Sequence, residues 1–295
     1  MKPTQTMITR RQFLTITTTT TAGLALPQWL SAAGQTGCCI EWGVCTSLKK
    51  AAVLKAAGFQ FVEENVSSVL VPKAGEEDFE KKLAEIKAAP LPIRSCTGFL
   101  PGDLKVVGPE VPMDALMKHA EIVFRRAEKA GIGRIVFGSG GSRKVPEGFD
   151  CAKAKTQFTD YCRRIAPLAQ AHKVIVVIES LNKAECNFIN RVDEALAIAD
   201  AVNHPGVQVH VDIYHMMRED EGPESILKAG AKVQHCHIAE KAKRTAPGVD
   251  GDDFRAYFKA LKTIGYRGGM SIEGKWKDDQ LSKACSVLNE QFKSA

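Results

Sequence analysis

Eight short apolar runs, each followed by an amphipathic segment, constrain the fold of this chain more than any other feature of its sequence. The apolar runs span residues 39–45, 59–62, 92–96, 134–137, 174–178, 207–211, 233–236 and 269–272. The amphipathic segments span residues 48–57, 79–88, 113–130, 152–171, 192–202, 223–229, 254–264 and 280–292. Apolar residues three and four positions apart indicate helices, and short apolar runs between helices indicate buried parallel strands. Eight such strand–helix units are the number that closes a parallel sheet into a barrel.

An open, doubly wound sheet is the alternative fold for such an alternation. It would place a glycine-rich fingerprint after the first strand, but residues 45–48 read Cys-Thr-Ser-Leu. No low-complexity linker interrupts residues 38–295, and a closed barrel commonly takes about 250 residues. We therefore predict an α/β fold, a single-domain (β/α)8 TIM barrel over residues 38–295.

The first 33 residues have the succession of features that an export signal requires. Residues 9–14 read Thr-Arg-Arg-Gln-Phe-Leu, a diluted apolar stretch follows at 16–30, and two alanines at 32–33 follow Ser31. This order is typical of a cleaved twin-arginine signal peptide. The stretch is too polar and too short to anchor the chain as a membrane helix. We expect a signal peptide over residues 1–33, a periplasmic protein, and no membrane insertion after processing.

The net charge argues against a nucleic-acid partner. The formal charge is +6, and Lys2, Arg10 and Arg11 supply three of these charges within a leader that contains no acid. The remaining positive charge is scattered along the chain, whereas nucleic-acid binding calls for a basic patch.

The nine cysteines do not form a recognisable framework. Their number is odd, and no pair of CxxC motifs occurs. Because a chain of this length buries a sufficient core without cross-links, we expect mostly free thiols. The disulfide status of Cys38, Cys39 and Cys45 stays open.

Four consecutive predicted strands are each followed by a residue able to bind a metal. These residues are Glu179, Asp212, His237 and Glu273, separated by 33, 25 and 36 residues. A lone carboxylate at a strand end is commonly a helix cap, but four such side chains on one barrel rim would repel one another and lose solvent. A divalent cation removes that penalty. Three carboxylates and one imidazole suit Mn, Mg or Co, and zinc is also compatible.

Four motifs carry a family resemblance over residues 38–295. They are Ile-Glu-Ser-Leu-Asn at 178–182, Val-Asp-Ile-Tyr-His-Met at 211–216, His-Cys-His-Ile-Ala-Glu at 235–240 and Ser-Ile-Glu at 271–273. The chain resembles the xylose-isomerase-like TIM-barrel superfamily, in particular its sugar phosphate isomerase/epimerase family. The resemblance implies that one metal ion is held by the four strand-end residues. It also implies that His215, Glu240 and a basic residue near Arg244 contact the substrate, although Lys241 and Lys243 are alternatives to Arg244.

Two further residues are candidates for sugar binding. Glu63 ends the second predicted strand and resembles the family's acidic residue there, while a partner of a metal ligand and a helix cap are equal alternatives. Phe99 lies in a Phe-Leu-Pro-Gly-Asp-Leu segment similar to a loop of exported members. It either lines the sugar pocket or packs in the core.

The same residues define a reaction class. A metal on a sugar carbonyl stabilises the enediolate that forms when the α carbon loses its proton, and Glu179 and Glu273 are the candidate acid–base pair. We predict a metal-dependent sugar isomerase or epimerase; the alternative is a 3-keto-glycoside lyase or hydrolase with the same site. The partner is a small sugar or keto-sugar, and a homo-oligomer is compatible with the sequence.

Two remote alternatives belong to other functional classes. An abasic-site endonuclease needs further His and Asp ligands, which Glu63 and Thr97 do not supply. A non-catalytic sugar-binding barrel would not need both Glu179 and Glu273.

Overall fold

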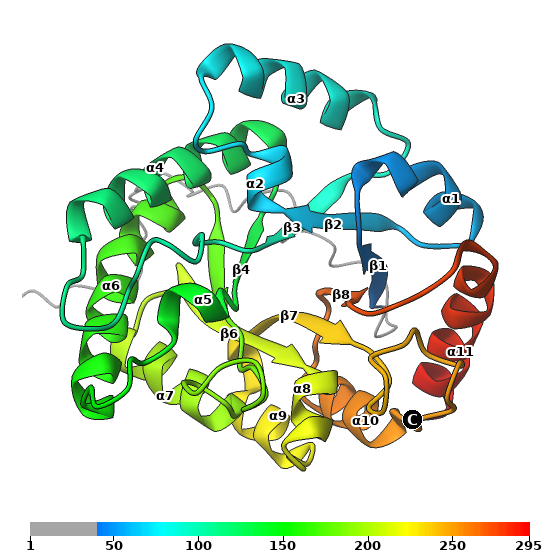
Figure 1. Cartoon of the computed structure of the whole chain (residues 1–295). Coiled ribbons are helices and arrows are strands. Elements are labelled where there is room, and N and C mark those ends of the chain that lie inside the picture. Colours follow the sequence, from blue (N-terminus) through cyan, green and yellow to red (C-terminus); the bar gives the residue numbers. More distant parts are fainter. Residues whose placement is uncertain (1–39) are drawn as a thin grey trace, which may run out of the picture. The chain divides into compact units, whose positions relative to one another are not determined.

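The computed structural model describes residues 40–295 and contains a closed barrel of eight parallel strands (Figure 1). Each strand pairs with the next along the chain, and β8 pairs with β1. The strands are β1 (Glu41–Cys45), β2 (Phe61–Asn65), β3 (Ile93–Thr97), β4 (Arg134–Phe137), β5 (Ile175–Ile178), β6 (Val207–Asp212), β7 (Val233–Ile238) and β8 (Gly269–Ile272). The predicted single-domain (β/α)8 barrel is confirmed. The predicted signal peptide, residues 1–33, lies outside the described residues.

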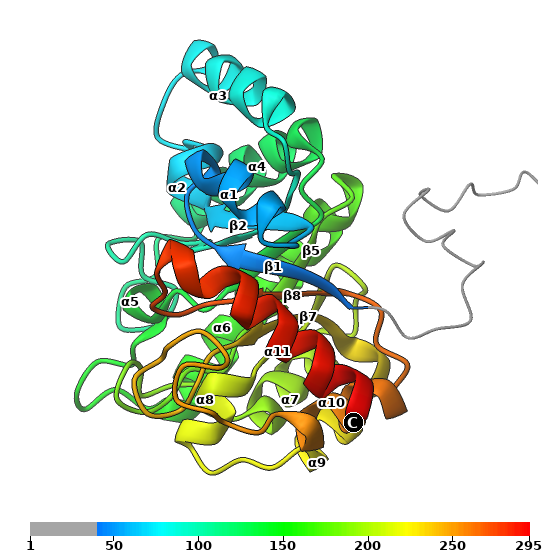
Figure 2. The same cartoon turned by 90° about the vertical axis from the view of Figure 1, so that its right-hand side faces the viewer.

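Helices surround the barrel (Figures 1 and 2). The α-helices are α1 (Ala51–Ala56), α2 (Val66–Val69), α3 (Glu76–Ala88), α4 (Met113–Ala130), α5 (Gly140–Arg143), α6 (Cys151–Ala171), α7 (Val192–Val202), α8 (Ile213–Arg218), α9 (Glu224–Ala229), α10 (Arg255–Thr263) and α11 (Leu281–Ser294). Residues 40–295 also form the short 3-10 helices η2 (Leu48–Lys50), η3 (Gly230–Lys232) and η4 (Asp278–Gln280).

The helices form where the apolar spacing predicts them. On α4, Leu116, Ala120, Val123 and Phe124 are buried at three- and four-residue spacing, which packs one face of the helix on the barrel. The helix ends at Gly131, whose φ of 72° is left-handed and therefore favours glycine.

Strand β2 differs from its prediction in both directions. The main chain at Phe59 still donates to Leu54 O and closes α1, so the strand begins at Phe61 rather than at residue 59. It then continues past residue 62, because Glu63 and Glu64 pair with β3 opposite Ser95 and Cys96. A criterion based on apolar runs ends the strand too early here, since a charged side chain points into the lumen.

Other expectations concern the thiols and the membrane. The seven cysteines within residues 40–295 are free, Cys45 among them, while Cys38 and Cys39 are not described. In that same part of the chain, no helix combines the length and apolarity needed to cross a bilayer.

A buried arginine stabilises the connection between α2 and α3. The Arg126 guanidinium, 2% exposed, donates to the main-chain oxygens of residues 70, 71, 74 and 75 at 2.6–3.2 Å. Arg126→Met should leave these carbonyls without a buried donor. We expect a loss of about 2–4 kcal/mol in the free energy of unfolding, measured by urea denaturation.

Arg125→Met is the matched control. Arg126 also donates to Glu76 at 2.8 Å. Arg125 binds this glutamate through two hydrogen bonds, but the Arg125 side chain is 36% exposed. Solvent screens such a pair, so the urea midpoint should hardly move. Equal destabilisation by the two substitutions would contradict the account.

Candidate functional site

The four predicted strand-end residues meet at one rim of the barrel. Glu179 and Glu273 directly follow β5 and β8, Asp212 ends β6, and His237 lies opposite Asp212 in the β6–β7 register. His237 is central: its Nδ1 lies 3.3 Å from Glu179 Oε1, 3.5 Å from Glu273 Oε2 and 4.0 Å from Asp212 Oδ2. We call Glu179, Asp212, His237 and Glu273 the rim ring.

A glycine makes room for one member of the ring. A Cβ atom added at Gly138, directly after β4, would lie 1.9 Å from Glu179 Oε2. Real Cβ atoms essentially never show so short a contact, so a side chain at residue 138 would displace the carboxylate of Glu179 from the ring.

His215 joins the ring from helix α8. Its main-chain N–H donates to Asp212 Oδ1 at 3.3 Å, and its Nε2 lies 3.5 Å from Asp212 Oδ2. The main-chain N–H of Asn182 donates to His215 Nδ1 at 3.2 Å, which leaves the Nε2 proton directed toward the acidic oxygens. Ligand atoms of Glu179, Asp212, His215 and Glu273 all lie within 4.8 Å of one another.

The donor set fits a divalent cation. Asp212 is fully buried, yet its Oδ2 accepts no hydrogen bond, and an unsatisfied buried carboxylate oxygen is costly. Three carboxylates converge there beside Nδ1 of His237 and the imidazole of His215. Such an oxygen-rich set suits Mn, Mg or Co.

Of the three basic candidates, Arg244 is the one that faces the ring. Its Nη2 donates to Glu273 Oε2 at 2.5 Å and its Nη1 to Glu185 Oε1 at 3.0 Å. Its guanidinium also lies 4.6 Å from the ring centroid of Tyr214, a cation–π contact. Lys241 and Lys243 pair with outlying aspartates instead.

The two glutamates have opposite electrostatic surroundings. Burial raises the pKa of Glu179, and the nearby Glu273 charge adds to this effect, although His237 opposes it. Burial would also raise the pKa of Glu273, but His237 and Arg244 outweigh it and lower that pKa to about 2. Paired carboxyls whose pKa values are driven apart are typical of acid–base pairs.

Glu63 lies below the rim ring, not at the sugar-binding surface suggested by its position in the sequence. It is fully buried, and its Oε1 lies 3.0 Å from His237 Nε2, while its Oε2 lies 2.6 Å from His235 Nε2. Burial would raise the pKa of Glu63, but the two imidazoles hold it well below its usual range. Of the three options that the sequence leaves open for Glu63, the structure favours that of a partner of His237. The assignment of Glu63 to substrate binding is corrected, because its side chain has no exposed surface.

The prediction that Glu240 contacts the substrate is also corrected. Its fully buried carboxylate accepts hydrogen bonds from the main-chain N–H groups of Gly248 at 2.7 Å and Gly251 at 2.9 Å, and from that of Asp250. With every oxygen occupied in this way, Glu240 organises the loop after Arg244 instead of contacting a sugar.

Phe99 lies in the core. It is fully buried, stacks on Phe124 at 5.4 Å between ring centroids and meets Phe137 edge-on at 5.2 Å. Of the two options that the sequence leaves open for Phe99, the structure favours core packing, and its assignment to the sugar pocket is corrected.

Glu185 is a site residue that the sequence analysis missed. It binds Arg244, and its Oε2 lies 4.0 Å from His215 Nε2. Glu185 belongs to the loop after β5, where no periodic pattern fixes side-chain direction. Its position six residues beyond Glu179 is the one signal in the sequence.

Comparison with known proteins identifies the family. The model of the xylose isomerase-like TIM barrel family matches residues 51–291. The chain therefore belongs to this family.

Two relatives of this chain carry the names of carbohydrate epimerases. The L-ribulose 3-epimerase of Methylomonas sp. (strain DH-1) is 38% identical over 112 residues, which are 38% of this chain and 39% of that enzyme. The chain thus spans about two fifths of the length of this relative. The 3-dehydro-D-guloside 4-epimerase of Escherichia coli (strain K12) is 25% identical over 245 residues, 80% of this chain and 90% of that enzyme.

A solved structure shares the fold. The 3-keto-D-glucoside 4-epimerase from E. coli superposes with a TM-score of 0.74 at 21% identity, over 85% of this chain and 100% of that one. At this identity the likeness shows the barrel alone.

Proposed function

We propose that this chain is a metal-dependent sugar epimerase or isomerase that moves a proton on the carbon next to a carbonyl group. The observation that carries the proposal is the pair Glu179 and Glu273, whose oxygens lie 3.3 and 3.5 Å from the same nitrogen of His237 at the barrel rim. The names of the epimerase relatives support the same reaction class.

The rim ring would hold the cation through the carboxylates of Glu179, Asp212 and Glu273 and through Nδ1 of His237. When bound, a divalent ion supplies positive charge against a substrate oxygen and so favours loss of the neighbouring proton. Mn, Mg or Co fit the set best, and zinc is compatible.

The two glutamates divide the proton transfers. Glu273, whose pKa is about 2, is ionised and accepts the proton from the α carbon, which leaves an enediolate on the sugar. Glu179, whose pKa is raised by burial, delivers a proton to the opposite face of the same carbon. One C–H bond breaks and one forms, so the configuration inverts with no net gain of protons by the substrate. Delivery to the neighbouring carbon would give isomerisation instead.

Two side chains beside the ring would orient the sugar. The Nε2 proton of His215 and the guanidinium of Arg244 both point to the acidic oxygens and offer donors to hydroxyl groups. Glu185 accepts from Arg244 at 3.0 Å and fixes its direction. Tyr214 supports the other face of the guanidinium.

A keto-sugar without phosphate is the substrate class that we favour. The relative matched over 80% of this chain carries the name of a 3-dehydro-sugar epimerase.

Elimination from a 3-keto-glycoside is the second candidate, because the same enediolate can expel a leaving group from the β carbon. A panel of aldoses, ketoses and 3-keto-glycosides distinguishes inversion, isomerisation and elimination by product.

We also propose the exported, periplasmic location that the leader indicates. Changing Arg10 and Arg11 to Lys should retain the precursor in the cytoplasm, because the arginine pair is the recognised element. Cell fractionation and immunoblotting of the two forms make the measurement. Continued appearance of a shortened periplasmic form would contradict it.

The first prediction on the site concerns metal content. Purified protein should carry about one divalent ion per chain at the rim ring, and Asp212→Ala should reduce this to near zero with little change in circular dichroism. Elemental analysis makes the measurement. Asp220→Ala is the control, because Asp220 is an exposed partner of Lys241. Two or three ions per chain in the unchanged protein would favour the endonuclease class.

The second prediction concerns the proton. Turnover in heavy water should place deuterium on the α carbon, and Glu179→Gln or Glu273→Gln should reduce turnover roughly 10²–10⁴-fold. Because both residues are also proposed ligands, metal content must be measured in the same samples. Glu77→Gln, on the exposed face of α3, is the control. A glutamine variant with full metal and full turnover would remove that residue from the acid–base pair.

A further inference from the structure

A layer of polar side chains fills the barrel lumen directly below the rim ring. Strand alternation turns residues two positions apart to the same side of a strand. His210, His235 and Ser271 each lie two positions before a member of the rim ring, so their side chains point inward below it. All three are at most 2% exposed, and Glu63 of β2 completes the group. We call Glu63, His210, His235 and Ser271 the lumen layer. Aliphatic side chains dominate the interior of such barrels, so this layer requires an explanation.

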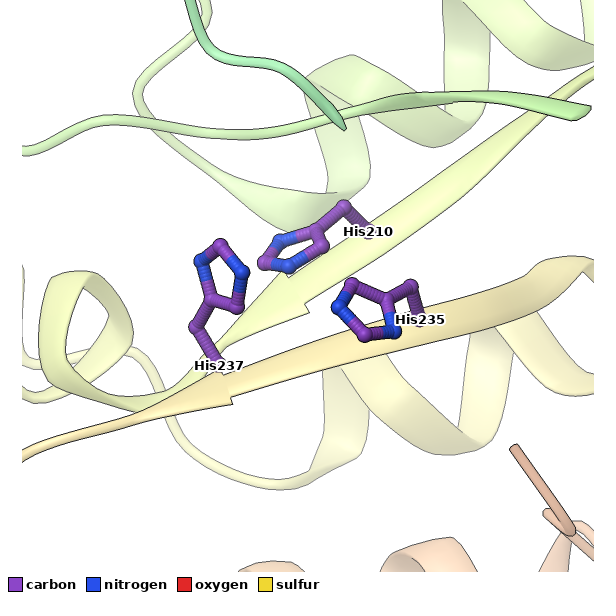
Figure 3. A group of neighbouring side chains, drawn as sticks. All are labelled: His210, His235 and His237. Atoms are coloured by element: carbon purple, nitrogen blue, oxygen red, sulfur yellow. The ribbon is translucent and has the colours of Figure 1, made fainter. Parts of the chain in front are cut away.

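Three imidazoles meet in this region. Figure 3 shows His210 on β6 beside His235 and His237 on β7, and the centroids of the His210 and His237 rings lie 4.2 Å apart. Their nitrogens are close enough to suggest a second metal site. Neither nitrogen of His210 has a hydrogen-bond partner, although the side chain is fully buried.

The distances at Glu63 favour shared protons over a second metal. Its Oε2 lies 2.6 Å from His235 Nε2 and accepts from Ser271 Oγ at 2.6 Å. Two atoms bound to one zinc ion at about 2.0–2.2 Å stand about 3 Å or more apart in tetrahedral geometry. A separation of 2.6 Å is that of a short, charge-assisted hydrogen bond. Glu63 and His235 therefore hold a proton between them.

The other oxygen of Glu63 acts on the rim ring. Glu63 Oε1 lies 3.0 Å from Nε2 of His237, and Nδ1 of the same imidazole faces Glu179 at 3.3 Å. A carboxylate at Nε2 keeps the proton on that nitrogen, which leaves the Nδ1 lone pair for a cation.

We propose that Glu63 is the positioning residue of the rim ring: it accepts the Nε2 proton of His237 and thereby directs Nδ1 to the metal position. His235 and Ser271 fix Glu63 in turn through its second oxygen. The inference rests on the proposed metal site, and it assigns to Glu63 a role other than contact with substrate.

The test compares two neighbouring glutamates. Glu63→Gln should weaken the binding of Co²⁺ roughly 10–100-fold, the usual effect of losing the carboxylate behind a ligating histidine. Glu64→Gln is the control: the Glu64 side chain accepts only from the main-chain N–H of Leu48 at 2.7 Å among the described residues, and an amide oxygen can do the same. Ser271→Ala retains Glu63 but removes one of its hydrogen-bond donors, so this variant should weaken Co²⁺ binding by a smaller factor. It provides the test if Glu63→Gln fails to fold.

A second readout does not depend on the metal. In full-length protein labelled with ¹⁵N-histidine, His237 should carry a strongly deshielded Nε2 proton without added metal, and Glu63→Gln should remove that signal. In the zinc-loaded protein, Nδ1 of His237 should be the metal-bound nitrogen.

The outcomes separate the two proposals. If the unchanged protein binds no Co²⁺ but His237 shows its deshielded Nε2 proton, the metal site fails and the Glu63–His237 bond stands. Unchanged Co²⁺ affinity in Glu63→Gln, or a metal-bound Nε2, overturns the positioning role. A second equivalent of Co²⁺ that is lost in His210→Ala would overturn it as well, since the lumen layer would then hold a metal.

Discussion

The repulsion among the carboxylates of Glu179, Asp212 and Glu273 is the constraint on which the rest of this site depends. Their ligand atoms lie within 4.8 Å of one another at the barrel rim, in surroundings that remove most of the solvent. Arg244 neutralises part of this charge through Glu273, but Asp212 Oδ2 stays without a donor. A divalent cation is the simplest group that neutralises the negative charge that Arg244 does not neutralise.

The barrel turns this local requirement into a layered arrangement. Strands β6, β7 and β8 each deliver a rim residue and, two positions earlier, a side chain to the lumen. The polarity of the rim therefore continues downward into His210, His235 and Ser271, which lie beside Glu63 of β2. Burial would make such a layer costly, but the hydrogen bonds of Glu63 satisfy both of its oxygens. The fold thus positions His237 from below and Arg244 from the loop above.

The sequence predicts the barrel and the rim ring well because both follow from local position. A residue at the end of a parallel strand lies on one known rim, whichever side chains surround it. The direction of a side chain in a loop, and its depth in the barrel lumen, depend on contacts between residues that are distant in the sequence. Glu240 binds a loop around Gly248, Phe99 turns into an aromatic cluster, and Glu63 meets His235 across the barrel. No spacing in the sequence reveals these contacts.

Anomalous diffraction from crystals grown with Mn²⁺ tests the central claim most directly, because it locates the ion without any assay of activity. The account predicts a single strong peak bonded to the carboxylates of the rim ring and to Nδ1 of His237. A peak among the three imidazoles of the lumen, on the Nε2 side of His237, would contradict it, and so would the absence of any peak at millimolar Mn²⁺.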